Sequence, residues 1–180
     1  QLASHKRAIS NFCNILTGKS IPVRFQGSDS YTDGKTITIS STINEKNFDP
    51  TVGLALHEAS HILKSDFEFL KKTNFTTGQV KNLLNYVEDR RIDYFVFKTS
   101  PGYKGYYHEM YKKYFYSKVI DKMLLSSEMR ELNWESYEAR IINLHNKNTQ
   151  LSSLPGLKEI YSIVGLGSIS RLESSEDAFN

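Results

Sequence analysis

The stretch DPTVGLALHEASHIL, residues 49–63, decides the fold. It opens with Asp49, a residue type suited to cap a helix, and with Pro50, which fits the first helical turn. Apolar side chains then recur at helical spacing and form one stripe, which consists of Val52, Ala55, Leu56, Ala59, Ile62 and Leu63. The sequence therefore predicts an amphipathic helix that packs against a core.

The same helix carries an H-E-x-x-H pattern, made by His57, Glu58 and His61. Residues four apart lie on one helical face, so both imidazoles can reach a single ion with the glutamate beside them. The two histidines point roughly away from the apolar stripe. Imidazole suits zinc, and a carboxylate beside zinc-bound water can take its proton. We therefore predict His57 and His61 as zinc ligands and Glu58 as the general base of a metallohydrolase.

A second helix is predicted over 79–98 from the apolar positions Val80, Leu83, Leu84, Val87, Tyr94 and Phe95. Glu88 falls at the margin of this stripe, whereas Asp89 and Asp93 fall toward the polar side. We therefore predict Glu88 as the third zinc ligand, with Asp89 or Asp93 accepting the free N–H of a ligating histidine. Arg91 falls within the stripe and is expected to pair with a carboxylate. The alternative is a salt-bridged helix surface without metal.

Two strands are predicted before the motif, over 21–25 and 35–40, because the apolar period there is two. A turn-rich segment separates them. If 37–40 were a sheet edge, its free backbone groups could pair with an extended peptide and present it to the metal. An ordinary half-buried strand is the other interpretation. The predicted fold class is α+β and mainly helical, with a small sheet preceding the motif helix.

Further helices are predicted over 2–16, 103–125 and 128–147, with a short one starting near Leu154. The segment 165–180 is rich in Gly and Ser and has no periodicity. The sequence therefore predicts one domain over 1–164, followed by a flexible tail or linker over 165–180.

Several other residues are candidates for a role at the site. Asp66 is a weaker candidate ligand, because the segment 64–78 reads as a solvated loop. One tyrosine of the aromatic helix over 103–125, or His108, is a candidate for stabilising the oxyanion that forms when water attacks a carbonyl. His5 and His145 are expected at the surface.

Composition excludes several classes of function. The chain has 180 residues and a net charge of +3, and its Lys and Arg residues are scattered, which argues against a nucleic-acid partner. The single cysteine, Cys13, excludes an intramolecular disulfide and suits a reducing compartment. No apolar run approaches the roughly 20 residues that span a bilayer, and no signal-peptide pattern opens the chain. We expect a cytoplasmic protein without a membrane partner.

The chain resembles a family of bacterial and phage metallopeptidases that are often encoded beside, or fused to, von Willebrand A domains and MoxR-type ATPases. The resemblance rests on the H-E-x-x-H motif and on NYVEDRRID, residues 85–93, which is similar to that family's N-x-x-E-D-x-R-x-[DE] segment. A Pro-Gly-Tyr break at 101–103 before a tyrosine-rich helix is also similar. Together these features cover about residues 50–116.

The resemblance implies a zincin of the gluzincin type, with His57, His61 and Glu88 as zinc ligands and Glu58 as base. Gluzincins often place an Asp four residues after the ligating Glu, and Ile92 stands at that position here. The function that follows is zinc-dependent hydrolysis of a peptide or protein substrate in a bacterial cytoplasm, by a host or phage enzyme. The alternative is a non-catalytic, metal-stabilised module of a larger assembly, such as a phage particle or an ATPase complex.

Overall fold

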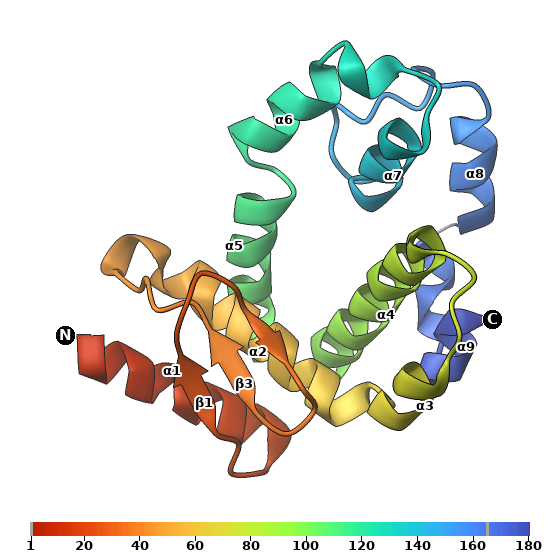
Figure 1. Cartoon of the computed structure of the whole chain (residues 1–180). Helices are drawn as coiled ribbons and strands as arrows, with labels where there is room; N and C mark the ends of the chain where they lie inside the picture. Colours follow the sequence, from red (N-terminus) through yellow and green to blue (C-terminus); the bar gives the residue numbers. More distant parts are fainter. Residues whose placement is uncertain (1, 165) are drawn as a thin grey trace. The chain divides into compact units, whose positions relative to one another are not determined.

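A computed structural model describes residues 2–164 and 166–180. The chain is mainly helical and has one three-stranded sheet, which confirms the predicted α+β class (Figure 1). It divides into two compact units. Unit 1 comprises Gln1–Met110 together with Ile169–Asn180, and unit 2 comprises Tyr111–Ser168. This differs from the single domain with a tail that the sequence predicts.

The elements follow one another along the chain without a repeat. Unit 1 contains α1 (Leu2–Thr17), β1 (Val23–Phe25), β2 (Tyr31–Thr32), β3 (Ile37–Ile39), η1 (Glu45–Asn47), α2 (Phe48–Lys64), α3 (Phe67–Lys72), α4 (Gly78–Thr99), η2 (Pro101–Tyr103) and α9 (Ser175–Phe179). Unit 2 contains α6 (Lys118–Leu125), η3 (Glu128–Arg130), α7 (Trp134–Ile142) and α8 (Leu157–Val164). Two elements span the boundaries between the units, α5 (Lys104–Tyr114) and η4 (Leu166–Arg171).

The sheet has the strand order β1-β3-β2. β1 runs parallel to β3, with Val23 opposite Ile37, and β2 runs antiparallel to it, with Thr32 also opposite Ile37. All three residues of β3 are buried. The segment 37–40 is therefore not a sheet edge, and the edge strand that lies against α2 is the short β2.

The motif helix α2 begins two residues earlier than its sequence suggests. Asn44 and Asn47 form a capping box around η1, and α2 continues from it at Phe48. Asp49 thus lies inside the first turn instead of capping it, where its negative charge still favours the helix N-terminus. The helix ends where Ser65 adopts an extended conformation.

α2 is the central helix of unit 1. It packs against α1, β3, β2 and α4, and α9 lies against α3 and α4 (Figure 1). The core between these elements contains the fully buried apolar residues Ile9, Cys13, Ile37, Ile39, Val52, Ala55, Leu56, Ala59, Ile92 and Val96. Because apolar contacts hold α2 on several sides, its polar residues at the α4 contact have fixed positions.

Gly53 of α2 lies directly against the backbone of α5. A Cβ atom at this position would lie 2.3 Å from the carbonyl oxygen of Tyr106 and 2.8 Å from Cβ of Met110. Neither neighbour can rotate away, because one is backbone and the other is the first atom of its side chain. The close helix contact therefore requires glycine.

Gly53→Ala is accordingly expected to destabilise unit 1 by about 1–3 kcal/mol or more, as overpacking a rigid contact does. The measurement is the free energy of unfolding by urea, monitored by circular dichroism. Gly105→Ala is the matched control, since a Cβ there meets nothing within 4 Å. An unchanged midpoint for Gly53→Ala would contradict the close approach of the two helices.

The structure departs from the predicted elements in four places. Within the helix expected over 128–147, only η3 and the nine-residue α7 form. The segment expected as a loop contains α3, whose first turn is capped by the Asp66 carboxylate at 2.9 Å from the Phe69 amide. The aromatic helix is broken between α5 and α6, where Ser117 is extended and caps α6. The segment expected as a flexible tail contains α9, with Ser175 buried. Gly165 lies outside the described residues.

Unit 2 is organised around Arg140, a fully buried cation. Its two terminal nitrogens donate to backbone carbonyl oxygens, those of Leu124 (3.0 Å), Met129 (2.8 Å), Asn148 (3.4 Å) and Thr149. The guanidinium thereby joins α6, η3 and the segment after α7.

Among the described residues, no helix is both long and apolar enough to cross a membrane.

Candidate metal centre

Two imidazoles and one carboxylate come together where α2 meets α4. The His61 Nε2 atom lies 3.1 Å from Asp89 Oδ1, and the His57 Nε2 atom lies 3.6 Å from the same oxygen. The two rings stand nearly perpendicular, with centroids 4.9 Å apart. Within the described part of the chain, this is the group of His, Cys, Asp and Glu side chains whose ligand atoms are close enough to share an ion.

The spacing of these atoms suits zinc. A tetrahedral zinc ion with bonds of about 2.1 Å holds its ligand atoms about 3.4 Å apart, which lies between the two distances to Asp89. Two neutral imidazoles and a carboxylate are also a donor set that zinc accepts while keeping a fourth position open. His57, His61 and Asp89 therefore fit a zinc ion.

Each imidazole also has a partner at its other nitrogen. The Nδ1 atom of His57 lies 2.7 Å from Asp93 Oδ1, and Asp93 is 1% exposed. The Nδ1 atom of His61 lies 2.8 Å from the Ser65 hydroxyl. A histidine that donates from Nδ1 presents an unprotonated Nε2. Both rings are thus held with Nε2 directed toward Asp89. The sequence predicted this role for Asp93 as one of two candidates.

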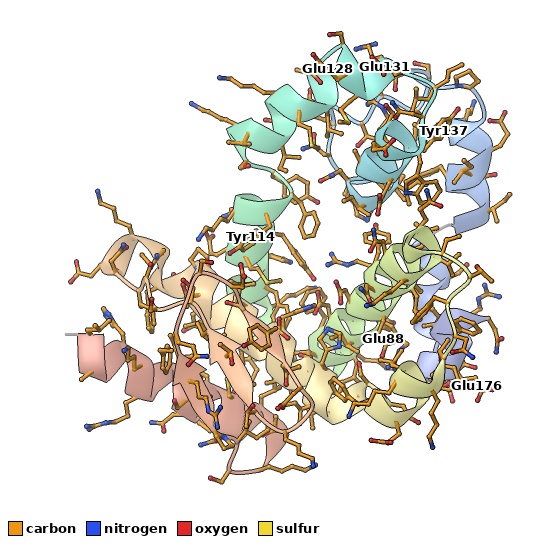
Figure 2. The ribbon with its side chains drawn as sticks, viewed as in Figure 1. Glu88, Tyr114, Glu128, Glu131, Tyr137 and Glu176 are labelled. Atoms are coloured by element: carbon orange, nitrogen blue, oxygen red, sulfur yellow. The ribbon has the colours of Figure 1, made fainter. Side chains whose placement is uncertain are left out.

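Glu88, predicted as the third ligand and labelled in Figure 2, lines a cavity that His57 and His61 also line, but other side chains bind its carboxylate. Its Oε1 accepts from Arg91 Nη2 at 2.7 Å, from Ser65 Oγ at 2.7 Å and from Ser175 Oγ at 2.8 Å, and its Oε2 accepts from Arg91 Nε at 2.8 Å. Three of these bonds thus reach Oε1 and one reaches Oε2. Glu88 is not part of the group with His57 and His61, and Asp89 takes that place. The predicted pairing of Arg91 with a carboxylate is confirmed.

The charges around the group raise the pKa of His57 and lower the pKa of Asp89. Burial alone would lower the pKa of His57, but the carboxylates of Asp93 and Asp89 outweigh burial and raise it well above the ordinary value. Burial opposes ionisation of Asp89, yet hydrogen bonds and charge from His57 and His61 hold its pKa far below the ordinary value. Both shifts favour the charged forms of the pair, an imidazolium at His57 and a carboxylate at Asp89.

Glu58 lines the same cavity as the three candidate ligands. It is 9% exposed, and burial raises its pKa above the usual value, although the neighbouring His57 and His61 oppose the shift. A carboxylate with a raised pKa can both accept and return a proton near neutral pH. Glu58 is therefore a buried carboxylate with a raised pKa in the cavity that His57, His61 and Asp89 line.

The cavity has a volume of about 330 Å³. Besides the residues already named, it is lined by Tyr31, Thr32, Phe67, Leu70 and Asn85. The tyrosine that lines it thus comes from the edge strand β2 and not from the aromatic helix. No sequence signal marks Tyr31, because a two-residue strand inside a turn-rich segment has no periodicity.

The other predicted candidates lie away from this cavity. Tyr107 is fully buried, and its hydroxyl makes a 2.5 Å hydrogen bond with Ser60 Oγ. His108 and His145 are exposed. Asp66 caps α3. None of these four residues lines the cavity with the imidazoles.

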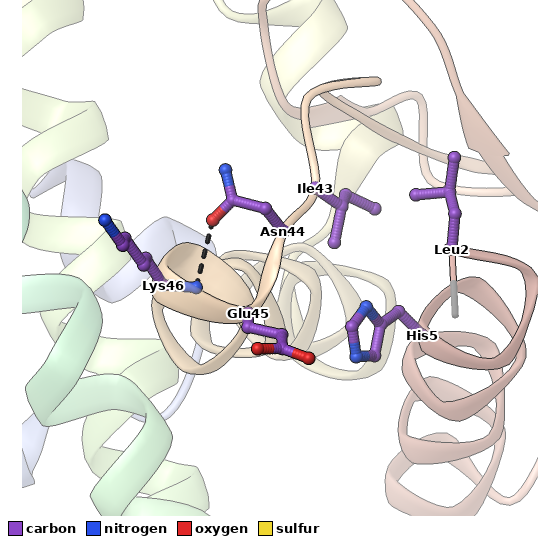
Figure 3. A pocket seen from close by; sticks show the side chains of 6 residues that line it. All are labelled: Leu2, His5, Ile43, Asn44, Glu45 and Lys46. Atoms are coloured by element: carbon purple, nitrogen blue, oxygen red, sulfur yellow. Dashed lines mark hydrogen bonds between the residues drawn. The ribbon is translucent and has the colours of Figure 1, made fainter.

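A second cavity, of about 600 Å³, lies between the start of α1 and the segment before α2 (Figure 3). Its lining includes His5, whose ring packs on Phe48 at 4.8 Å, and Asn44, whose side chain accepts from the Lys46 amide. These contacts are explained by packing and by helix capping. The smaller cavity is therefore the candidate functional site.

No protein-family model matches the chain, and comparisons with curated proteins and with solved structures find no match either. The resemblance to a metallopeptidase family stays a prediction. The candidate site is defined by its own geometry.

Zinc binding is expected to release a proton from His57. The raised pKa keeps this ring protonated over a pH range in which a free imidazole is already neutral, and zinc binds only the neutral ring. The apparent affinity should therefore rise about tenfold per pH unit from about pH 7 up to the raised pKa, if one proton is displaced.

Isothermal titration calorimetry in buffers of different ionisation enthalpy measures the number of protons released. Asp93→Asn is the comparison variant, because it removes the carboxylate nearest to His57 and should reduce the proton release at pH 7. A heat of zinc binding that is the same in all buffers would contradict the protonated state of His57.

Proposed function

We propose that the chain is a zinc-dependent metallopeptidase domain of the zincin type. The observation that carries the proposal is the convergence of His57, His61 and Asp89 on one point beside Glu58, in a cavity open to solvent. A surface salt bridge requires neither three converging ligand atoms nor a cavity with a further carboxylate. The added base, together with hydrogen-bonded partners behind both imidazoles, is typical of a hydrolytic metal site.

The residues would divide the work as follows. His57, His61 and Asp89 would hold a zinc ion, which supplies Lewis-acid activation of water and of a scissile carbonyl. Glu58 accepts the proton of the attacking water and returns it to the leaving amine, as its raised pKa favours. Asp93 accepts from Nδ1 of His57 and fixes the ring.

The position of Asp93 agrees with the gluzincin resemblance once Asp89 is taken as the ligand. Gluzincins often have an Asp four residues after the ligating carboxylate, and Asp93 is four residues after Asp89. Counted from Glu88, that position is Ile92. Asp89 as the ligand therefore gives the four-residue spacing to a second Asp that gluzincins often have, whereas Glu88 as the ligand does not.

We propose that the substrate of the chain is a peptide that binds in an extended conformation. β2 is an edge strand, and its residues Tyr31 and Thr32 line the cavity that also holds Glu58. An edge strand holds a peptide by backbone hydrogen bonds and leaves alternate side chains to pockets. We assign to β2 the role that the sequence suggested for 37–40.

The test is metal analysis combined with peptide cleavage by the purified chain. The proposal predicts one zinc per chain and cleavage of a mixed peptide library. It also predicts that cleavage stops with a zinc chelator and returns when zinc is restored. A chain that binds no zinc refutes the metal site. Zinc without cleavage of any peptide favours the alternative, a metal-stabilised module of a larger assembly.

A further inference from the structure

A chain of hydrogen bonds, buried at Ser175 and partly buried at Ser65, connects the C-terminal segment to His61. Ser175, 1% exposed, donates from Oγ to Glu88 Oε1 at 2.8 Å. Ser65 donates to the same oxygen at 2.7 Å, and its Oγ lies 2.8 Å from His61 Nδ1. The chain Ser175, Glu88, Ser65, His61 thus joins α9, α4 and the end of α2.

The direction of these bonds follows from counting protons. Arg91 donates to both oxygens of Glu88, at 2.8 Å to Oε2 and at 2.7 Å to Oε1, which is the bidentate pairing of a guanidinium with a carboxylate, so Glu88 only accepts. The Ser65 hydroxyl has one proton and donates it to Glu88. It can therefore only accept from His61, so this bond requires a proton on Nδ1. The Asp89 carboxylate, 3.1 Å from Nε2, competes for the single proton of the neutral ring, and a zinc ion at Nε2 would leave that proton on Nδ1.

The C-terminal segment is anchored at several points besides Ser175 Oγ. The Asp66 amide donates to this same oxygen at 2.8 Å, and Arg91 Nη1 donates to the Glu173 carbonyl at 3.2 Å. The Phe179 ring packs edge-on against Phe69, with centroids 6.0 Å apart. The C-terminal segment therefore does more than cover the surface, because the buried Ser175 hydroxyl donates to Glu88.

We propose that Ser175 and Ser65 are positioning residues of the metal centre, which act through Glu88 to fix the tautomer and orientation of His61. This inference rests on the proposed function for its use, since the fixed nitrogen is the proposed zinc ligand. The hydrogen bonds themselves exist without the metal, so the positioning role can be tested separately.

The first experiment uses the metal-free full chain and nitrogen-detected NMR of the histidine rings, at a pH where His61 is neutral. The parent chain should populate the Nδ1-protonated form, which donates to Ser65, in competition with the form that donates from Nε2 to Asp89. Ser65→Ala should shift the population toward the Nε2-protonated form, and Ser65→Thr, which keeps a hydroxyl, should restore the parent spectrum. A spectrum of His61 that Ser65→Ala leaves unchanged would overturn the proposal, whether or not the chain binds zinc.

The second experiment measures zinc affinity with a competing chelator. Ser65→Ala is expected to weaken zinc binding by about 10–100-fold, the usual effect of removing a partner of a ligating histidine. Ser175→Ala should weaken it less, because Arg91 and Ser65 still hold Glu88.

Ser174→Ala is the matched control for the second experiment. It removes the cap of α9 without touching Glu88, since Ser174 Oγ accepts from the Asp177 amide. Equal losses of zinc affinity for Ser174→Ala and Ser175→Ala would show that only the presence of α9 matters, and would overturn the role of Ser175. A parent chain that binds no zinc but has the expected His61 tautomer would refute the proposed function and leave the positioning role in place.

Discussion

Glu58→Gln is expected to reduce the rate of peptide cleavage by about 10²–10⁴-fold, the usual contribution of a positioned general base. The amide has nearly the shape of the carboxylate but cannot take a proton from water. Zinc content should stay at the parent value, because the proposed ligands are His57, His61 and Asp89. The measurement is kcat on a fluorogenic peptide, with metal analysis of the same sample.

Two controls make this result specific to the base. The unfolding midpoint of Glu58→Gln should not fall, since burial disfavours the ionised carboxylate that the substitution removes. Glu58→Asp shortens the side chain and should retain more activity than the glutamine variant. A glutamine variant that cleaves peptides at the parent rate would remove Glu58 from the mechanism.

Asp89→Asn is expected to weaken zinc binding by more than the roughly 100-fold upper limit for losing a hydrogen-bonded partner of a ligand. The substitution removes the charged oxygen that lies 3.1 Å and 3.6 Å from the two imidazole nitrogens. Zinc affinity is measured by competition with a chromophoric chelator, at a pH above the raised pKa of His57. At that pH protons no longer compete with the metal.

Glu88→Gln is the matched comparison, because it changes the neighbouring carboxylate in the same way. Its main effect should be on stability, a loss of about 3–5 kcal/mol, since the buried guanidinium of Arg91 loses its charged partner. Its zinc affinity should fall less than that of Asp89→Asn. The reverse order of zinc affinities would restore Glu88 as the ligand and exclude Asp89.

The sequence predicted the motif helix and the helix after it, because long segments with a strong apolar period leave little choice. It placed the third carboxylate at Glu88, whereas Asp89 lies beside the two imidazoles, because it assumed that an inward-facing ligand must lie beside the apolar stripe. At this crossing, α2 and α4 meet through polar side chains, so residues on the polar side of α4 face His57 and His61. Only the packing of two helices could show this.

Other features depend on contacts between distant residues, which periodicity cannot reveal. The segment 165–180 reads as a tail, yet Ser175 is buried because Asp66 and Glu88 from elsewhere in the chain bind its hydroxyl. Similarly, β2 exists only because β3 offers it backbone partners. The break between α5 and α6 had a local signal, the capping residue Ser117, which the aromatic repeat obscured.

The order in which the centre assembles follows from how far apart its contacts lie along the chain. His61 and Asp89 are 28 residues apart, and His57 and Asp93 are 36 apart, so the hairpin of α2 and α4 can form them early. The contacts of Ser175 span 87 and 109 residues, a detour that includes all of unit 2. Long loops close late and slowly. We therefore expect a folding chain to bring His57 and His61 to α4 before Ser175 reaches Glu88. Early zinc capture would then precede full rigidity of His61.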